Sequence, residues 1–205
     1  MRYSAEHKQE TRKRIVRAAA RQFCRPDGKG LAIADMMREL GLTHGGFYKH
    51  FDSKQQLLAA AISEFDEMEA GIVDAVSKAK PGAELKMIIE HYLRLEPCSN
   101  PGAGCPMAAL SSEIAGYPRA VRVEIDRAMQ RRIKRLAGFL PGKTGKERER
   151  NCLVLMSGMV GALNVARAAV DQESRKAILD ASKEFYIKAF LRNLHPKKYR
   201  RAFPR

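Results

Sequence analysis

Residues 33–57 read I-A-D-M-M-R-E-L-G-L-T-H-G-G-F-Y-K-H-F-D-S-K-Q-Q-L, and this stretch decides the fold of the N-terminal region. Apolar residues at helical spacing predict a short helix from about Ile33 to Leu40. Gly41 stands where that helix must turn, because glycine readily adopts the left-handed conformation found just after helices. Thr43 can then cap a second short helix, from about His44 to Phe51. Two short helices joined by a glycine-containing turn match the outline of a helix-turn-helix.

Longer helices are predicted on both sides of this stretch. Before it, Ile15, Ala19 and Phe23 are spaced four residues apart and mark the buried face of a first helix. After it, Asp52 or Ser53 can cap a long helix that starts at Lys54. The buried face of this last helix is expected to carry Leu58, Phe65 and Ile72.

The second short helix has the composition of a DNA-reading helix. In a helix-turn-helix, the second helix enters the major groove with its N-terminal residues against base edges. Here those residues are Thr43, His44, Gly45 and Gly46. Each glycine costs about 1 kcal/mol of helix stability relative to alanine, which makes sense if the backbone must approach DNA closely. The residues suited to phosphate contact follow: Tyr48, Lys49, His50 and Lys54. The pattern alone leaves DNA binding and an ordinary helical turn equally open.

Two segments resemble the TetR/AcrR family of bacterial repressors. The run G-L-T-H-G-G-F-Y-K-H-F-x-S-K, residues 41–54, resembles the family signature, and T-R-K-R-I-V-R-A-A-A-R-Q-F, residues 11–23, resembles its first helix. Together these segments lie in about the first third of the chain. The resemblance implies base contacts at Thr43, His44 and Gly45. It implies phosphate contacts at Tyr48, His50 and Lys54.

The chain departs from the family pattern at two positions. Met37 stands where the family usually has an alanine for a tight helix crossing, and Ala32 stands where a threonine often caps the helix and touches phosphate. These departures put the cap contact in doubt but leave the expected fold unchanged.

Composition is consistent with an all-α protein of two parts. The 205 residues carry a net charge of +15 and are 45% apolar, so the chain can bury a core and is expected to meet an anionic partner such as nucleic acid. We expect a three-helix helix-turn-helix domain over residues 1–53, a helical ligand-binding and dimerisation domain over 54–195, and a basic tail over 196–205.

The C-terminal region resembles one subgroup of the same family. G-C-P-M-A-A-L-S-S-E-I, residues 104–114, resembles the opening of its sixth helix, and M-S-G-M-V-G-A-L-N-V-A-R-A, residues 156–168, its eighth. The resemblance implies a pocket for an unidentified small-molecule effector. The candidate lining residues are Met107, Leu110, Glu113, Met156 and Met159. The alternative is that the methionines fill the core and that Glu113 is solvated or caps a helix.

Two stripes of residues indicate a homodimer. Small residues recur on one helix face at Gly158, Ala162, Ala166 and Ala169. An apolar stripe on the last helix carries Ile178, Ala181, Phe185 and Ala189. Two such helices from each subunit can form a four-helix interface, although both stripes can instead face the subunit's own core. We favour the interface, because paired operator half-sites need two reading heads about 34 Å apart.

The four cysteines form no C-x-x-C pair. In a chain without a visible secretion signal they are expected to be reduced thiols in the cytoplasm. Cys105 precedes a predicted helix, where a thiol becomes more reactive, and Cys98 is close enough in sequence to pair with it. An oxidant sensor is therefore one hypothesis, and a buried packing thiol is the favoured alternative. A metal site from His91, Cys98 and Cys105 is disfavoured by ligand number and spacing.

No residue pattern indicates catalysis, and no cofactor or metal is expected. The longest apolar stretch, residues 153–170, is interrupted by Asn164 and Arg167 and favours a buried helix over a membrane span. The sequence thus predicts a homodimeric, ligand-responsive repressor of a palindromic operator. The alternatives are a thiol-based sensor acting through Cys105, a nucleic-acid packaging protein without sequence preference, and a small-molecule binder whose DNA domain has lost its function.

Overall fold

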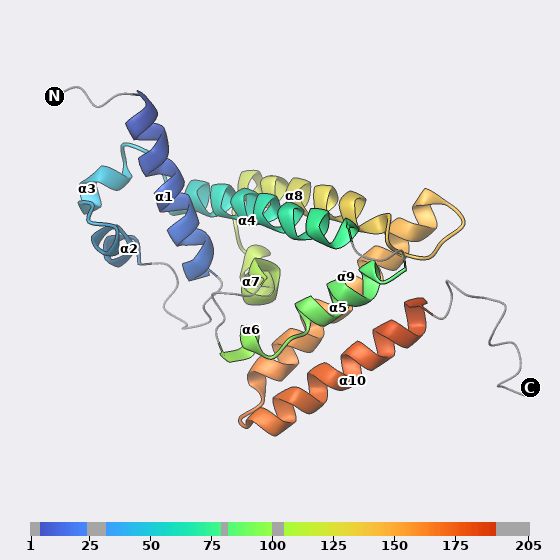
Figure 1. Ribbon diagram of the computed structural model, residues 1–205. Coiled ribbons are helices and arrows are strands. Elements are labelled where there is room, and N and C mark those ends of the chain that lie inside the picture. The colour runs from blue at the N-terminus through green and yellow to red at the C-terminus, as the bar shows by residue number, and fades with distance from the viewer. Residues whose placement is uncertain (1–4, 24–31, 79–81, 100–104, 192–205) are drawn as a thin grey trace, which may run out of the picture. The chain divides into compact units, whose positions relative to one another are not determined.

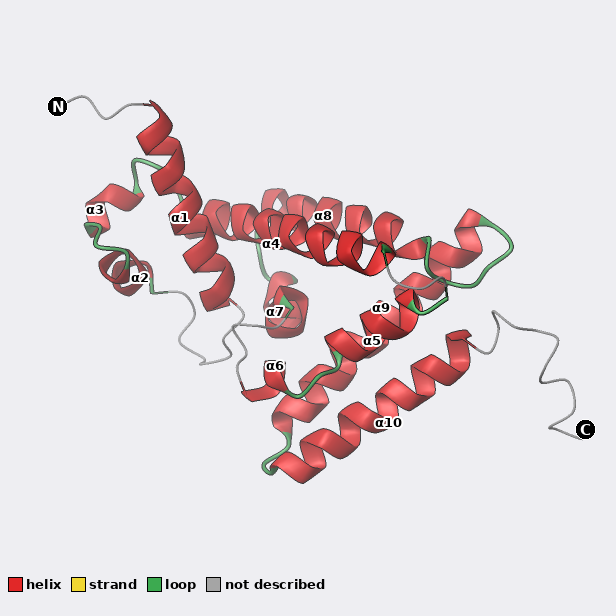
Figure 2. Cartoon of the chain, in the orientation of Figure 1, coloured by secondary structure: helices red, strands yellow, loops and turns green. Residues whose placement is uncertain are grey.

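The computed structural model describes residues 5–23, 32–78, 82–99 and 105–191, and every regular element in these ranges is a helix (Figures 1 and 2). The predicted all-α fold class is therefore confirmed. The predicted tail over 196–205 lies outside the described residues, as do Cys24 and the side chain of Ile72.

The helices follow one another along the whole chain. In order they are α1 Ala5–Phe23, α2 Ile33–Glu39, α3 His44–Phe47, α4 Lys54–Ser77, α5 Glu84–Tyr92, α6 Glu96–Ser99, α7 Pro106–Ile114, α8 Arg119–Ala137, α9 Gly145–Ala168 and α10 Gln172–Leu191.

The chain forms two compact units. The first contains residues 1–69 and 100–129, and the second contains residues 70–99 and 130–205. Helices α4 and α8 thus contribute residues to both units. The predicted boundary after residue 53 separates the expected DNA-binding part from the expected ligand-binding part, whereas the two compact units are defined by contacts. This boundary stays a prediction.

The core of the first unit joins α1, α2 and α3 to parts of α4, α7 and α8. Ile15, Ala19 and Phe23 are buried, as their four-residue spacing predicts. Phe47 and Phe51 are fully buried, and their rings stack with centroids 5.7 Å apart. Burying an aromatic side chain of this size contributes about 2–3 kcal/mol, so these two rings anchor the segment around α3.

The second unit is built on the pairing of α9 with α10, with α5 against α10 and α6 against α9. Helix α9 begins with a capping box, in which the Thr144 hydroxyl accepts from the Glu147 N–H and the Glu147 carboxylate accepts from the Thr144 N–H. Gly158 lies against Tyr186. A Cβ at position 158 would be 2.6 Å from Cζ of that ring.

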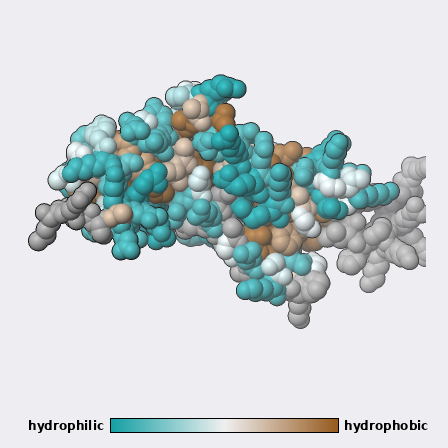
Figure 3. Space-filling model, turned by 90° about the horizontal axis from the view of Figure 1, so that it is seen from above, coloured by the Kyte–Doolittle hydropathy of each residue, from teal (hydrophilic) through white to brown (hydrophobic). Residues whose placement is uncertain are grey.

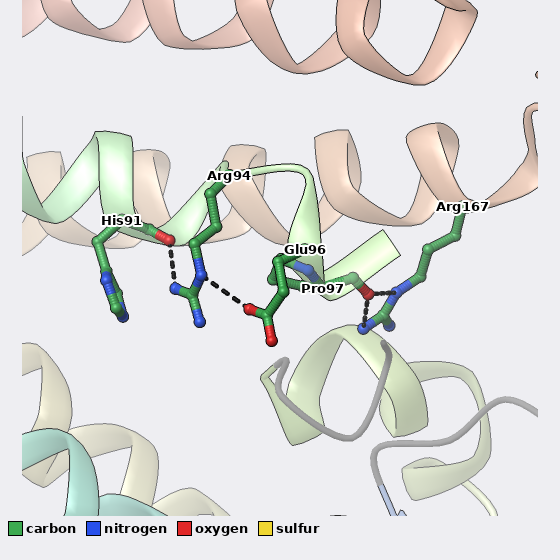
Figure 4. A network of polar contacts seen from close by, with 5 residues as sticks. All are labelled: His91, Arg94, Glu96, Pro97 and Arg167. Atoms are coloured by element: carbon green, nitrogen blue, oxygen red, sulfur yellow. Dashed lines mark hydrogen bonds and ion pairs between the residues drawn. The ribbon is translucent and has the colours of Figure 1, made fainter. Parts of the chain in front are cut away.

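Arg167 ties the C-terminal end of α9 to α6 (Figure 4). Its Nε and Nη2 each donate to the backbone carbonyl of Pro97 at 3.3 Å. Arg94 lies nearby and donates to the carboxylate of Glu96 at 2.9 Å and to the carbonyl of His91 at 2.6 Å. These contacts stabilise α6 and the segment that joins it to α5. With four residues, α6 is too short to be stable through its own backbone hydrogen bonds.

Two of the four residues of the small-residue stripe on α9 pack within their own subunit, which corrects the interpretation of these two as part of an intersubunit face. Ala166 is fully buried, and Gly158 packs against Tyr186 of α10. Small residues let α10 approach closely here, and the partner is within the same chain. By contrast, Phe185 on α10 is 65% exposed, and Val154 and Val165 on α9 are more than half exposed.

Among the described residues, one helix is long and apolar enough to cross a bilayer, namely α9. This is weak evidence for a span, because core helices of soluble proteins meet the same criterion. On the face seen in Figure 3, hydrophilic residues dominate and apolar residues gather in small areas.

Candidate nucleic-acid interface

The turn between α2 and α3 is a Schellman motif. Gly41 has φ +70°, its N–H donates to the Arg38 carbonyl at 3.0 Å, and the Leu42 N–H donates to the Met37 carbonyl at 2.8 Å. This is the pair of backbone bonds that closes a helix through a left-handed residue. The position of Gly41 predicted the turn, and the prediction is confirmed. At the other end of α2, Ala32 offers no side-chain cap, as expected for that departure from the family pattern.

Helix α3 is capped by Thr43, whose hydroxyl accepts a hydrogen bond from the Gly46 N–H at 3.2 Å. The cap was predicted, but the predicted end of the helix was wrong. Helix α3 ends at Phe47, and residues 48–50 continue as turns. The carbonyl of Phe47 accepts from both His50 and Phe51, at 2.9 and 3.0 Å. The chain thus leaves α3 in a tight turn, and this turn places both Phe47 and Phe51 in the core.

The two glycines of α3 occupy different surroundings. A Cβ on Gly45 would meet nothing within 4 Å, whereas a Cβ on Gly46 would lie 3.3 Å from the Thr43 hydroxyl oxygen and 3.7 Å from Cε of Met37. Met37 is fully buried. The methionine that replaces the usual alanine at this crossing therefore reaches toward the space that Gly46 leaves open.

Tyr48 points away from the core and is 60% exposed. Its ring stands edge-on to Phe47, with centroids 5.2 Å apart, and edge-on to His44, with centroids 5.9 Å apart. The buried phenylalanine thus supports an exposed phenol beside the start of α3. An exposed hydroxyl held in this way can donate to a phosphate oxygen.

Lys54 is the first residue of α4 and is exposed. The cap comes from Ser53, whose hydroxyl accepts from the Gln56 N–H at 3.1 Å, and the Gln56 side chain accepts from the Asp52 N–H at 2.7 Å. The sequence left Asp52 and Ser53 open as caps, and Ser53 takes the role. A helix N-terminus that carries a lysine is a favourable place for a phosphate.

Two arginines of α1 contact the helix-turn-helix, and sequence reasoning missed both of them. The guanidinium of Arg12 lies over the Phe51 ring, 4.5 Å from its centroid, and Arg14 Nη2 donates to the Leu40 carbonyl at 3.0 Å. The second contact satisfies a carbonyl at the end of α2. An arginine-rich first helix was the available signal, but its spacing alone does not say which carbonyl or ring it meets.

A cleft of about 580 Å³ opens between the N-terminal part of α1 and the turn that leads into α3. Its lining comes from α1, from α2 and the turn after it, and from the segment around α3, and includes Lys8, Thr11, Met37, Thr43, Lys49 and His50. Nδ1 of His50 is buried and has no hydrogen-bond partner among the described residues. Burial, followed by Lys8, Arg12 and Lys49, lowers the pKa of His50 below its ordinary value.

The predicted effector-binding residues fall into two groups. Met107 and Leu110 pack with the core of the first unit, while Met156 and Met159 are buried in the second. Glu113 is exposed, and it accepts a hydrogen bond from the Tyr117 hydroxyl at 3.0 Å. Burial first, and then this carboxylate, raises the pKa of Tyr117 to about 12. The assignment of an effector to these five residues stays a prediction.

The three described cysteines, Cys98, Cys105 and Cys152, are buried. Cys105 is the N-cap of α7, as the predicted helix start requires. Burial raises the pKa of Cys98, and it raises the pKa of Cys152 to about 11. Within the described part of the chain, no cluster of three His, Cys, Asp or Glu side chains is arranged to hold a metal ion.

The arrangement just described defines a helix-turn-helix head in a chain whose described regular elements are all helices, and many bacterial transcriptional regulators are of this class. The family profile described as bacterial regulatory proteins, tetR family, matches residues 15–61. The match to this family thus lies in the helix-turn-helix region, and solved TetR regulators share the fold over most of the chain.

Curated relatives match a part of the chain. Over 67 residues the chain is 34% identical to the HTH-type transcriptional regulator TtgR of Pseudomonas putida, a match that covers 33% of this chain and 32% of TtgR. The chain thus spans about a third of the length of the curated relatives it matches.

Solved structures share the fold over most of the chain. A TetR regulator from Legionella pneumophila is 18% identical, with TM-score 0.72 over 93% of this chain and 100% of that one. FadR from Bacillus subtilis, solved in complex with stearoyl-CoA, is 13% identical, with TM-score 0.64 over 85% of this chain and 97% of its own. The resemblance of residues 104–114 to one subgroup stays a prediction.

Proposed function

We propose that this protein is a cytoplasmic transcriptional repressor that binds a palindromic operator as a homodimer and is released when a small-molecule effector binds its C-terminal domain. The observation that carries the proposal is the capped reading helix. Thr43 and the Gly41 turn fix its start, and exposed Tyr48 and Lys54 follow it in the chain. Donors close to a short capped helix suit a protein that binds phosphates around one contact with bases.

Charge supports a DNA partner as well. The net charge of +15 is large for a chain of 205 residues, and phosphate neutralisation supplies most of the affinity in such complexes. Charge alone would suit a packaging protein equally. The capped helix of the helix-turn-helix favours sequence-specific binding over packaging.

The homodimer rests on the exposed apolar surface of α9 and α10. Val154 and Val165 of α9 and Phe185 of α10 are each more than half exposed, although α9 and α10 pack against each other. Within the most apolar 18-residue window of α9, only 33% is buried. Apolar helix faces of this kind are typically covered by a second copy, and pairing two subunits would also pair two reading heads.

Effector release would be a shift between two conformers of the dimer. A ligand releases DNA only if it binds the non-DNA-binding conformer more tightly than the DNA-bound one. The solved complex of FadR with stearoyl-CoA supports the idea that this fold can hold a ligand.

The deciding experiment measures binding to the DNA upstream of the protein's own gene, with unrelated DNA of equal length as competitor, at near-physiological salt. We expect a preference of about a thousand-fold or more, the usual gap between specific and nonspecific binding. The variants Tyr48→Phe and Lys54→Gln should weaken binding to both DNAs, because phosphate contacts carry no sequence information. Lys13→Gln, an exposed charge change on α1, is the control. Equal affinity for both DNAs in the wild type would contradict the proposal.

A further inference from the structure

The cleft between α1 and the turn into α3 has the size of a small-molecule site. Its volume of about 580 Å³ falls within the range of about 300–1,000 Å³ typical of small-molecule sites. All the lining residues belong to the first compact unit, between residues 7 and 50. The cleft is thus complete within a single subunit and independent of any pocket in the C-terminal domain.

The inner wall of the cleft is apolar. Most of the accessible lining of the cleft is apolar; Leu42 is half-buried, and the fully buried Met37 lies beneath this surface. A DNA phosphate gains nothing from apolar carbons, because it is bound by donors and by positive charge. The apolar wall therefore indicates a ligand with a hydrocarbon body.

The outer wall is cationic. Lys8 on α1 and Lys49 after α3 are exposed and line the cleft, and both act electrostatically on the His50 imidazole between them. An acidic group bound in the cleft would meet these two ammonium groups in charge-assisted contacts.

We propose that this cleft binds an organic anion with an aromatic or aliphatic body, and that the bound anion excludes DNA from the reading head. Thr43 and Gly46 line the same cleft, so the ligand and the DNA would compete for one surface. This route differs from effector release through the C-terminal domain, because it needs no change in the spacing of the two heads. The exclusion of DNA rests on the proposed function, whereas binding of the anion does not.

The test uses 8-anilinonaphthalene-1-sulfonate, an aromatic anion whose fluorescence rises in apolar surroundings. N-phenyl-1-naphthylamine has the same rings without the sulfonate and serves as the uncharged control. We expect saturable binding of the anion by the full-length protein. Affinity should fall about tenfold in Lys8→Gln and in Lys49→Gln, each of which loses a charge-assisted contact. Lys13→Gln removes an equal charge from an exposed position of α1 that does not line the cleft, and it should leave binding unchanged.

A second arm adds short duplex DNA at low salt, where even nonspecific complexes form. DNA should displace the anion from the wild type in proportion to the DNA bound. Three results would overturn the proposal: equal affinity for the charged and uncharged probes, affinity indifferent to both cleft lysines, or fluorescence unchanged when DNA is bound. If the protein binds no DNA at all, the proposed regulatory function fails, while the lysine variants still decide whether the cleft binds anions.

Discussion

The hydroxyl of Thr43 accepts a hydrogen bond from the Gly46 N–H, and a Cβ on Gly46 would lie 3.3 Å from that same oxygen. Gly45, its neighbour, has open space at its Cβ position. The fold therefore explains glycine at position 46, where a side chain would crowd the helix cap. It does not explain glycine at position 45. A residue that breaks the local rules of helix stability without a packing reason is expected to serve function.

Gly45→Ala should separate folding from DNA binding. Alanine favours helix by up to about 1 kcal/mol over glycine, so the free energy of unfolding should stay constant or rise. DNA affinity should fall at least about tenfold if the backbone approaches DNA here. Urea unfolding and a DNA titration measure the two effects. Gly46→Ala is the comparison, and it should lower stability relative to Gly45→Ala because it crowds Thr43. Wild-type DNA affinity in Gly45→Ala would show that this backbone stays clear of DNA.

Gly158→Ala should destabilise the second unit. The new Cβ would collide with the Tyr186 ring, whose Cζ and Cε1 lie 2.6 and 3.1 Å from its position. Overpacking of this kind costs about 1–3 kcal/mol. Gly161→Ala is the matched control on the same helix, since its Cβ would meet nothing within 4 Å. Thermal unfolding checks both, and Tyr186→Leu should restore stability to Gly158→Ala. Equal melting temperatures for the two alanine variants would refute the close packing of α9 on α10.

The charge of His50 should link pH to both stability and DNA binding. Burial, then Lys8, Arg12 and Lys49, lowers the pKa of the folded-state imidazole below its ordinary value of 6.5. The unfolded chain therefore binds more protons as pH falls through this range, and the free energy of unfolding decreases. DNA phosphates beside His50 favour the imidazolium instead, so DNA affinity should increase over the same fall in pH.

Urea unfolding and DNA titrations at pH values of about 7.5 and 5.5 test both trends. His50→Gln should lose the pH dependence of DNA binding. His91→Gln should lose only part of the pH dependence of stability, because burial and Arg94 lower the pKa of His91 in the second unit. An unchanged pH dependence of DNA binding in His50→Gln would remove this residue from the interface.

Phe185→Glu should produce monomers. Phe185 is 65% exposed on α10, and a carboxylate there would be buried against the partner in the proposed dimer, at a cost of several kcal/mol. Sedimentation equilibrium measures the change in mass. Met87→Glu places the same charge on an exposed apolar residue of α5, 42% exposed, and should leave the mass unchanged. A dimer that persists in Phe185→Glu would place the subunit interface elsewhere.

The buried thiols should react slowly in the folded protein. Burial raises the pKa of both Cys98 and Cys152, so few of these thiols are ionised near neutral pH, and the thiolate is the reactive form. Alkylation by iodoacetamide, followed by peptide mass spectrometry, should label them mainly after unfolding. Cys105→Ser should likewise leave DNA release by peroxide unaltered. Loss of peroxide-driven release in that variant would instead support the thiol-sensor alternative.

Local rules explain what the sequence predicted well. Gly41 and Thr43 act through their own backbone and nearest neighbours, so a turn and a cap follow from residue type and position. The buried face of α1 follows in the same way from a four-residue spacing.

Such local rules did not predict where α3 ends. Nothing in residues 44–51 breaks a helix by propensity after the two glycines, and the end comes from packing. Phe47 and Phe51 both enter the core, and the Phe47 carbonyl is shared between two N–H groups. The stripe on α9 failed for a related reason. Small residues predict close approach of another helix, but they do not say whether that helix belongs to the same chain.

The short reading helix has a consequence for how a target is found. Of its four residues two are glycines and Phe47 is buried, so His44 alone presents an exposed side chain from within α3. One good contact to a base distinguishes base pairs by about 1–3 kcal/mol, while a genome offers about a million or more competing positions. A single head would be lost among them. In the proposed homodimer, discrimination would come from two short recognition sites at a fixed separation and from the deformability of the DNA between them, which the protein can sense without touching its bases.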